Sequence, residues 1–267
     1  MFVSCFLATV SAIIYLMKKK RIVIGNWKMS PPTLAEAKIL FRKVSIVAAK
    51  LQNVDTVICP PFVFLSQFMG TRAKLGAQDV FWQNGERFTG EISAEMLFSL
   101  GVSYCLAGHS ERRALGETDE QVSKKVQVAT QAGLSVVLCV GERERDANGV
   151  YFEFLKNQIR NSFLGVKPRF LSQVIIAYEP VWAIGKSFRD AMSPTDIGET
   201  AIFIRKVLSD IYGQGAVANV PILYGGSVET ENVSDVLRFG GVAGALVGHK
   251  SLVAEEFTKI LKIANTL

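Results

Sequence analysis

The chain has 267 residues, of which 49% are hydrophobic, 20% charged and 10% aromatic, and this composition excludes a disordered, collagenous or coiled-coil protein. The formal net charge is +6, but residues 18–21 (KKKR) supply four of these charges. The remaining surplus is too small to indicate nucleic-acid binding. The four cysteines, at positions 5, 59, 105 and 139, include no C-x-x-C pair. We therefore expect no metal site and no disulfide framework, and we predict a reducing compartment, the cytoplasm.

The chain begins with an apolar segment, residues 1–17 (MFVSCFLATVSAIIYLM), and positive charges follow it directly. The segment is shorter than the ~20 residues of a spanning helix, and a secretory signal would carry its charges before the apolar stretch. Three interpretations stay open for residues 1–16: upstream translation with Met17 as the true initiator, a short membrane anchor with a cytoplasmic basic flank, or an ordered extension. We favour the first, which predicts no membrane contact and one domain over residues 17–267.

Eight short apolar runs rich in β-branched residues recur along the rest of the chain. They do not alternate between apolar and polar residues, which is typical of parallel strands buried on both faces. We expect strands at residues 22–24, 56–59, 76–78, 104–107, 136–140, 174–178, 221–224 and 245–247.

Helical patterns separate these runs, because apolar residues recur at steps of three and four. Two such stripes are Leu34, Ala37, Phe41, Val44 and Ala48, and Ile197, Ala201, Ile204, Leu208 and Ile211. Helix starts are indicated by Thr33 with Glu36, by Thr118 with Gln121, and by Ser193 before Pro194. Eight β-α repeats without a linker predict a single-domain (β/α)₈ barrel of the α/β class. An open doubly wound sheet is the alternative, but its G-x-G-x-x-G turn is missing after the first run.

Chemically versatile residues stand just after several of the runs, where barrel enzymes place their active sites. Asn26 and Lys28 follow the first run, His109 the fourth and Glu179 the sixth. A single lysine is more often a solvated surface residue, and a histidine or glutamate can serve structure alone. We favour a functional interpretation because all four converge on one mouth. Backbone N–H groups of the turn after His109 disfavour a charged imidazole, which predicts a neutral ring.

Glycines follow the last two runs, at Gly225, Gly226 and Gly248. They can be plain turn residues, but glycine-rich turns and a short helix after strands seven and eight form the phosphate site of many barrels. We therefore predict that this part of the mouth binds a phosphate group.

Four motifs in order resemble the triosephosphate isomerase family: residues 25–29 (GNWKM), 108–113 (GHSERR), 177–185 (AYEPVWAIG) and 224–228 (YGGSV). The resemblance covers residues 20–267. It implies a glycolytic and gluconeogenic enzyme that interconverts dihydroxyacetone phosphate and D-glyceraldehyde 3-phosphate without a cofactor. It also implies that Glu179 is the base and His109 the electrophile, while Asn26, Lys28, Gly185, Ser227 and Gly248 bind the substrate. Such a reaction needs one carboxylate to take and return a proton and a neutral donor to polarise the carbonyl.

The segment 78–91 (QDVFWQNGERFTGE) resembles the family's dimer loop, in which a threonine, here Thr89, reaches the partner's site. The resemblance thus implies a homodimer. We interpret Phe81, Trp82 and Phe88 as exposed aromatics that a partner would bury.

Two segments depart from the family pattern. The lid, residues 183–194, is two residues longer than the usual A-I-G-T-G-K-T-A-T-P and lacks its central glycine and lysine; Gly185, Ser187 and Phe188 are the candidates for its contacts. The turn after the last run reads VGHKSL instead of V-G-G-A-S-L, so His249 is either a phosphate ligand or a rim residue. Another phosphosugar isomerase or epimerase, or a non-catalytic interaction protein, remains an alternative function. The complete set of Asn26, Lys28, His109 and Glu179 favours the isomerase.

Overall fold

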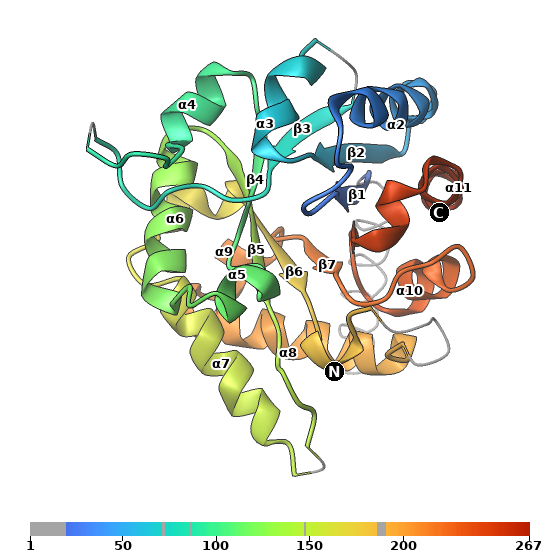
Figure 1. The fold of residues 1–267 in the computed structure, drawn as a ribbon. Helices are drawn as coiled ribbons and strands as arrows, with labels where there is room; N and C mark the ends of the chain where they lie inside the picture. The colour runs from blue at the N-terminus through green and yellow to red at the C-terminus, as the bar shows by residue number, and fades with distance from the viewer. Residues whose placement is uncertain (1–19, 71–72, 86, 147, 186–190) are drawn as a thin grey trace.

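A computed structural model describes residues 20–70, 73–85, 87–146, 148–185 and 191–267. These residues form a closed barrel of eight parallel strands that pair in chain order, with β8 returning to β1 (Figure 1). The eight predicted strands and the barrel are confirmed. The strands are β1 (Arg21–Asn26), β2 (Val54–Cys59), β3 (Lys74–Ala77), β4 (Tyr104–Ala107), β5 (Ser135–Val140), β6 (Val174–Tyr178), β7 (Ile222–Tyr224) and β8 (Gly244–Val247).

Helices surround the barrel and connect each strand to the next (Figure 1). They are α2 (Leu34–Ala48), α3 (Phe62–Leu65), α4 (Ala94–Ser99), α5 (Ser110–Ala114), α6 (Asp119–Gln131), α7 (Val150–Ser162), α8 (Pro194–Tyr212), α9 (Gln214–Val217), α10 (Val233–Phe239) and α11 (Ala254–Asn265). Short 3₁₀ turns lie at Ser66–Phe68, Pro168–Gln173, Val181–Ala183 and His249–Leu252.

The predicted helix starts are confirmed. Thr33 accepts a hydrogen bond from the Glu36 N–H at the start of α2, and Ser193 caps α8 with Pro194 in its first turn. Thr118 and Gln121 form a complete capping box at α6, in which each side chain bonds to the other residue's backbone N–H. These local signals therefore set where the helices begin.

One residue of the predicted stripes is misplaced. Ile211, in the last turn of α8, is 36% exposed, whereas the buried stripe of that helix ends at Leu208. Tyr212 takes the inward position of this turn instead, and its hydroxyl donates to the Val166 carbonyl at 2.9 Å. The step from Leu208 is thus four residues rather than three.

Both faces of the strands are buried, which explains why the strand sequences do not alternate. Eleven residues form one cluster inside the barrel: Ile24, Val57, Cys59, Tyr104, Leu106, Val137, Cys139, Ile175, Ala177, Leu223 and Leu246. Their chain neighbours, such as Val23, Ile58 and Cys105, belong to the larger core between strands and helices. Cys59, Cys105 and Cys139 are free, buried thiols.

Residues 1–19 lie outside the described residues, so the interpretations of residues 1–16 stay predictions. Within the described ranges, no helix has the length and apolar character needed to cross a membrane.

Candidate active site

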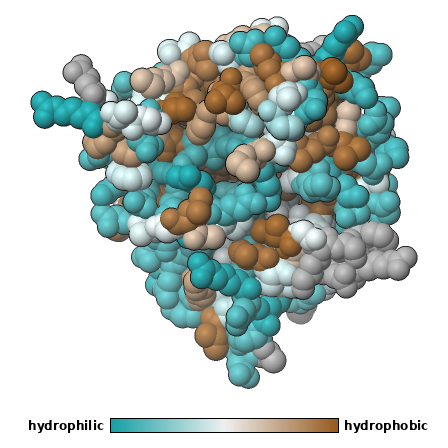
Figure 2. All heavy atoms as spheres, in the orientation of Figure 1, coloured by the Kyte–Doolittle hydropathy of each residue, from teal (hydrophilic) through white to brown (hydrophobic). Residues whose placement is uncertain are grey.

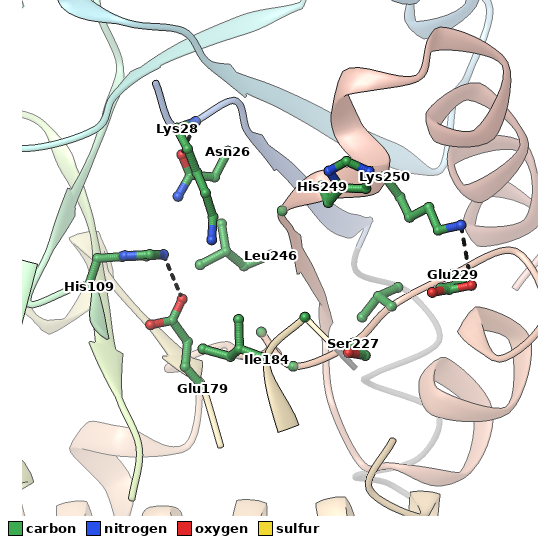
Figure 3. Close-up of a pocket in the computed structure, with 15 residues that line it drawn as sticks. Asn26, Lys28, His109, Glu179, Ile184, Ser227, Glu229, Leu246, His249 and Lys250 are labelled. Carbon is green, nitrogen blue, oxygen red and sulfur yellow. Dashed lines mark hydrogen bonds and ion pairs between the residues drawn. The ribbon is translucent and has the colours of Figure 1, made fainter. Parts of the chain in front are cut away.

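A cavity of about 440 Å³ opens at the carboxyl ends of the strands (Figure 3). Every residue that the sequence predicted as catalytic or phosphate-binding at the strand ends lines it. The lining consists of Asn26, Lys28, His109, Glu179, Ile184, Gly185, Gly225, Gly226, Ser227, Val228, Glu229, Leu246, Gly248, His249 and Lys250. Residues separated by more than 200 positions in the chain therefore share one site.

Glu179 and His109 face each other across this cavity (Figure 3). Glu179 directly follows β6, and its backbone N–H donates to the Val140 carbonyl at 2.7 Å. Its side chain is almost fully buried: Oε2 accepts the Ser110 N–H at 3.2 Å, and Oε1 lies 3.2 Å from His109 Nε2. Two donors thus hold the carboxylate in position.

The backbone decides which nitrogen of His109 carries the proton. His109 is the N-cap of α5, and its Nδ1 accepts the Glu111 N–H at 3.2 Å. A ring nitrogen that accepts a hydrogen bond carries no proton, so the proton of the neutral ring is on Nε2. This nitrogen is the one that faces Glu179. The geometry therefore agrees with the predicted neutral imidazole.

Lys28 reaches the cavity through an unusual backbone conformation. Its φ is +52°, a region that residues with a side chain rarely adopt. Two contacts hold this turn: the Lys28 N–H donates to Asn26 Oδ1 at 3.0 Å, and the Lys28 carbonyl accepts from Gln78 Nε2 at 2.7 Å. The ammonium lies 2.6 Å from Glu111 Oε1. Such local strain is typical of functional sites, where surrounding contacts maintain it.

Glycines form the opposite wall because side chains do not fit there. A Cβ on Gly225 would lie 2.8 Å from Glu179 Cγ, and one on Gly226 would lie 2.3 Å from the Tyr224 hydroxyl oxygen. Ser227 donates to the Ala183 carbonyl at 2.8 Å and so ties the turn after β7 to the segment after β6. The close packing brings these backbone turns to the cavity surface.

Sequence reasoning missed several contributors to the site. Ile184, Val228 and Leu246 give the wall its apolar part, and Glu229 and Lys250 add an ion pair. The positions of Glu229 and Lys250, a few residues after β7 and β8, were the available signal. Gln78 was predicted as the end of the third strand and the start of the dimer segment, but it follows β3, and its side chain donates to the Lys28 carbonyl.

A buried carboxylate anchors the segment that leads into the predicted lid. Glu142 accepts hydrogen bonds from the Tyr178 hydroxyl and from Trp182 Nε1, both at 2.9 Å. Burial, with the nearby Glu142 carboxylate, raises the pKa of the Tyr178 hydroxyl well above its ordinary range. Residues 186–190 of the lid, including Ser187 and Phe188, lie outside the described residues.

The segment between β3 and α4 projects from the side of the barrel (Figure 1). Thr89 is exposed there, and Phe88 is 42% exposed. The prediction that Phe81 is exposed is wrong, because only 7% of this residue is accessible. Its ring packs on Trp82 and Phe88, with centroids 4.3 and 4.7 Å apart. The loop therefore buries one of its aromatics within itself.

The fold and the site together define a (β/α)₈-barrel enzyme built for proton transfer on a small substrate. Comparison with known proteins is more specific. The family described as Triosephosphate isomerase matches residues 21–264. A triosephosphate isomerase of Thermoanaerobacter pseudethanolicus is 42% identical over 249 residues, which cover 91% of this chain and 99% of the relative. One of Endomicrobium trichonymphae is 41% identical over 251 residues, covering 91% and 98%.

The chain belongs to the triosephosphate isomerase family. This membership confirms the predicted enzyme class, an intramolecular aldose–ketose isomerase, over another phosphosugar isomerase or epimerase.

Proposed function

We propose that this chain interconverts dihydroxyacetone phosphate and D-glyceraldehyde 3-phosphate, with Glu179 as the base and His109 as the hydrogen-bond donor. One observation carries the assignment of roles. The Glu179 carboxylate lies 3.2 Å from the protonated nitrogen of His109 at the edge of a cavity of about 440 Å³. A proton acceptor and a neutral donor at this spacing suit a substrate in which the carbon that loses the proton is bonded to the carbonyl carbon. The acceptor then faces that carbon, and the donor faces the carbonyl oxygen.

The reaction follows from this geometry. The substrate enters between the two side chains and takes over the His109 N–H with its carbonyl oxygen. Glu179 then removes a proton from the carbon next to the carbonyl, which leaves an enediolate whose oxygen His109 Nε2–H stabilises. His109 Nε2–H gives its proton to the enediolate oxygen and takes the proton of the neighbouring hydroxyl, so the ring returns to its starting state. The proton on Glu179 then returns to the carbon that carried the original carbonyl, and the new carbonyl forms at the other position. No group leaves and no electron donor is needed.

Other residues bind the substrate. The Lys28 ammonium supplies positive charge beside the enediolate, and Asn26 shapes the turn that presents it. The phosphate occupies the side of the cavity formed by Gly185, Ser227, Gly248 and His249, where backbone N–H groups come close to the surface. Ile184 and Leu246 exclude water from the reacting atoms.

The Glu179→Gln variant tests the base. It keeps the volume and the contact with Ser110 but cannot accept a proton, so kcat should fall about 10²–10⁴-fold. The measurement is a coupled assay of D-glyceraldehyde 3-phosphate isomerisation. The exposed Glu153→Gln serves as the matched control and should keep full activity. Activity near that of the parent chain in the Glu179 variant would refute the assignment.

The same assay, run on the full chain and on protein that begins at Met17, tests the domain assignment. We expect residues 17–267 to form the catalytic domain and both proteins to show equal kcat and equal melting temperature. A glycolytic role supports a cytoplasmic location, which cell fractionation tests. Recovery of intact chain in the membrane fraction would favour the anchor instead.

A homodimer is the assembly that the exposed surface supports. Large apolar side chains are exposed after three neighbouring strands: Met29 (94%) after β1, Val63 (77%) after β2, and Phe88 (42%) and Met96 (60%) after β3. These residues share the mouth side of adjacent strands with Thr89, and a second copy would bury them. Sedimentation analysis should show a dimer, and deletion of residues 83–89 should shift it to monomer. A parent chain that sediments as a monomer would refute the proposal.

A further inference from the structure

An ion pair joins the turns after β7 and β8 at the edge of the cavity (Figure 3). Lys250 Nζ lies 3.3 Å from Glu229 Oε2, and the two side chains are 32% and 18% exposed. Both residues line the cavity that holds Glu179 and His109. The pair is thus part of the site, although neither residue contacts the reacting groups.

Glu229 is held in place independently of Lys250. Its backbone N–H donates to Asn232 Oδ1 at 2.8 Å, and the Asn232 amide donates to the Ser227 carbonyl at 2.9 Å. The next residue, Thr230, donates to Glu256 in α11 at 3.1 Å. Loss of Lys250 would therefore leave the backbone of Glu229 in place and its carboxylate without its ion-pair partner.

Among the described residues, Lys250 pairs with Glu229 alone, because the neighbouring carboxylate, Glu256, pairs with Lys259. Glu256 Oε1 pairs with Lys259 at 3.0 Å, and that contact, more than Lys250, lowers the pKa of Glu256. On its own turn, Lys250 follows Gly248 and His249 in a short segment that Ser251 closes by donating to the Gly248 carbonyl at 2.7 Å. The ammonium therefore extends from one glycine turn to the carboxylate of the other.

We propose that the Lys250–Glu229 pair sets how tightly the site binds the phosphate dianion of its substrate, with Lys250 cancelling a carboxylate that would otherwise repel that dianion. The inference rests on the proposed function for the place of the phosphate. A partly buried charge in the wall of a cavity acts strongly on a dianion bound there, because water screens it less than on the open surface. Lys250 is a positioning and specificity residue in this scheme, and proton transfer stays with Glu179.

Three variants separate this electrostatic role from a mechanical one. Lys250→Met leaves Glu229 uncompensated and should raise KM for D-glyceraldehyde 3-phosphate about 5–30-fold at low salt, with little change in kcat. Glu229→Gln frees the ammonium and should leave KM equal or lower. The double variant, Lys250→Met with Glu229→Gln, should return KM close to that of the parent chain. Lys206→Met, which removes a cation from the exposed Lys206–Asp210 pair on α8, is the matched control.

Two further measurements keep the test decisive. Glyceraldehyde without phosphate should be turned over with the same kcat/KM by all variants, and added salt should reduce the KM difference of Lys250→Met. Calorimetry with inorganic phosphate should give the same order of affinities without turnover. Equal KM increases in both single variants, a double variant no better than Lys250→Met, or equal losses with glyceraldehyde would overturn the proposal. If the parent chain and the variants bind phosphate with the expected order of affinities but the parent chain does not isomerise triose phosphate, the proposed function is refuted and the role of the ion pair stands.

Discussion

The two ends of the cavity are built in different ways. At the proton-transfer end, formed by Asn26, Lys28, His109 and Glu179, chemistry resides in side chains that neighbouring groups hold in place. At the glycine end, formed by residues 185, 225–227 and 248–250, the wall is largely backbone, and side chains are absent where packing is tight. The first end therefore depends on residue identity, and the second depends on backbone shape.

This difference explains where the sequence tolerates change. A backbone N–H is present whatever side chain its residue carries, provided that the dihedral angles are accessible. The turn after β8 accordingly carries His249 and Lys250 and still lines the cavity. Replacement of His109 or Glu179 has no such compensation, since no neighbouring group offers the same chemistry at the same place.

Because the proton-transfer end depends on residue identity, His109→Gln should reduce kcat more than a substitution at the glycine end does. Glutamine can still donate a hydrogen bond, but it lacks the fixed Nε2–H that the Glu111 N–H imposes on the ring. We expect kcat to fall about 10²–10³-fold with KM little changed, since the lost donor acts on the developing enediolate. Ser227→Ala at the glycine end is the comparison, and its kcat/KM should fall about tenfold at most, which corresponds to the loss of one neutral hydrogen bond. Steady-state kinetics gives kcat and KM for both variants. An equal fall in kcat/KM for the two would contradict the division between the two ends.

Gly225→Ala tests whether the two ends are mechanically coupled. Its Cβ would lie 2.8 Å from Glu179 Cγ, so the methyl group must displace the base. A shift of about 1 Å at the reacting group can cost ~10²-fold in rate. We expect this loss in kcat, with inorganic phosphate bound as well as by the parent chain. A variant that loses phosphate affinity but keeps kcat would show that the turn serves the anion only.

Tyr178→Phe tests the support beneath the site and should affect stability more than catalysis. It removes the hydroxyl that donates to the buried Glu142 at 2.9 Å, while Trp182 still donates to the same oxygen. Loss of a hydrogen bond to a charged group lowers the free energy of unfolding by about 1.5–3 kcal/mol. Denaturant titration measures the change. We expect kcat to fall less than about tenfold, and an unchanged unfolding midpoint would show that the Tyr178 hydrogen bond is dispensable.

Local sequence determined the elements of this protein and the residue types of its site. Apolar runs without alternation identified all eight strands, and the Thr118–Gln121 capping box marked the start of α6. Position after a strand identified Lys28, His109 and Glu179, because parallel strands that close into a barrel bring their carboxyl ends to one mouth. The four motifs indicated the family before any contact between them was known.

Only the tertiary structure decided how these residues act on one another. The contact between His109 Nε2 and Glu179 joins residues that lie 70 positions apart, and the clash that keeps Gly225 a glycine depends on Glu179, which lies 46 positions earlier. Phe81 and Ile211 were misjudged for the same reason, since burial depends on which neighbour fills the inward space, and periodicity does not specify that neighbour. The Lys250–Glu229 pair joins two turns that are separated in sequence by α10 and β8, so the parallel pairing of β7 with β8 is what brings its charges to the same site.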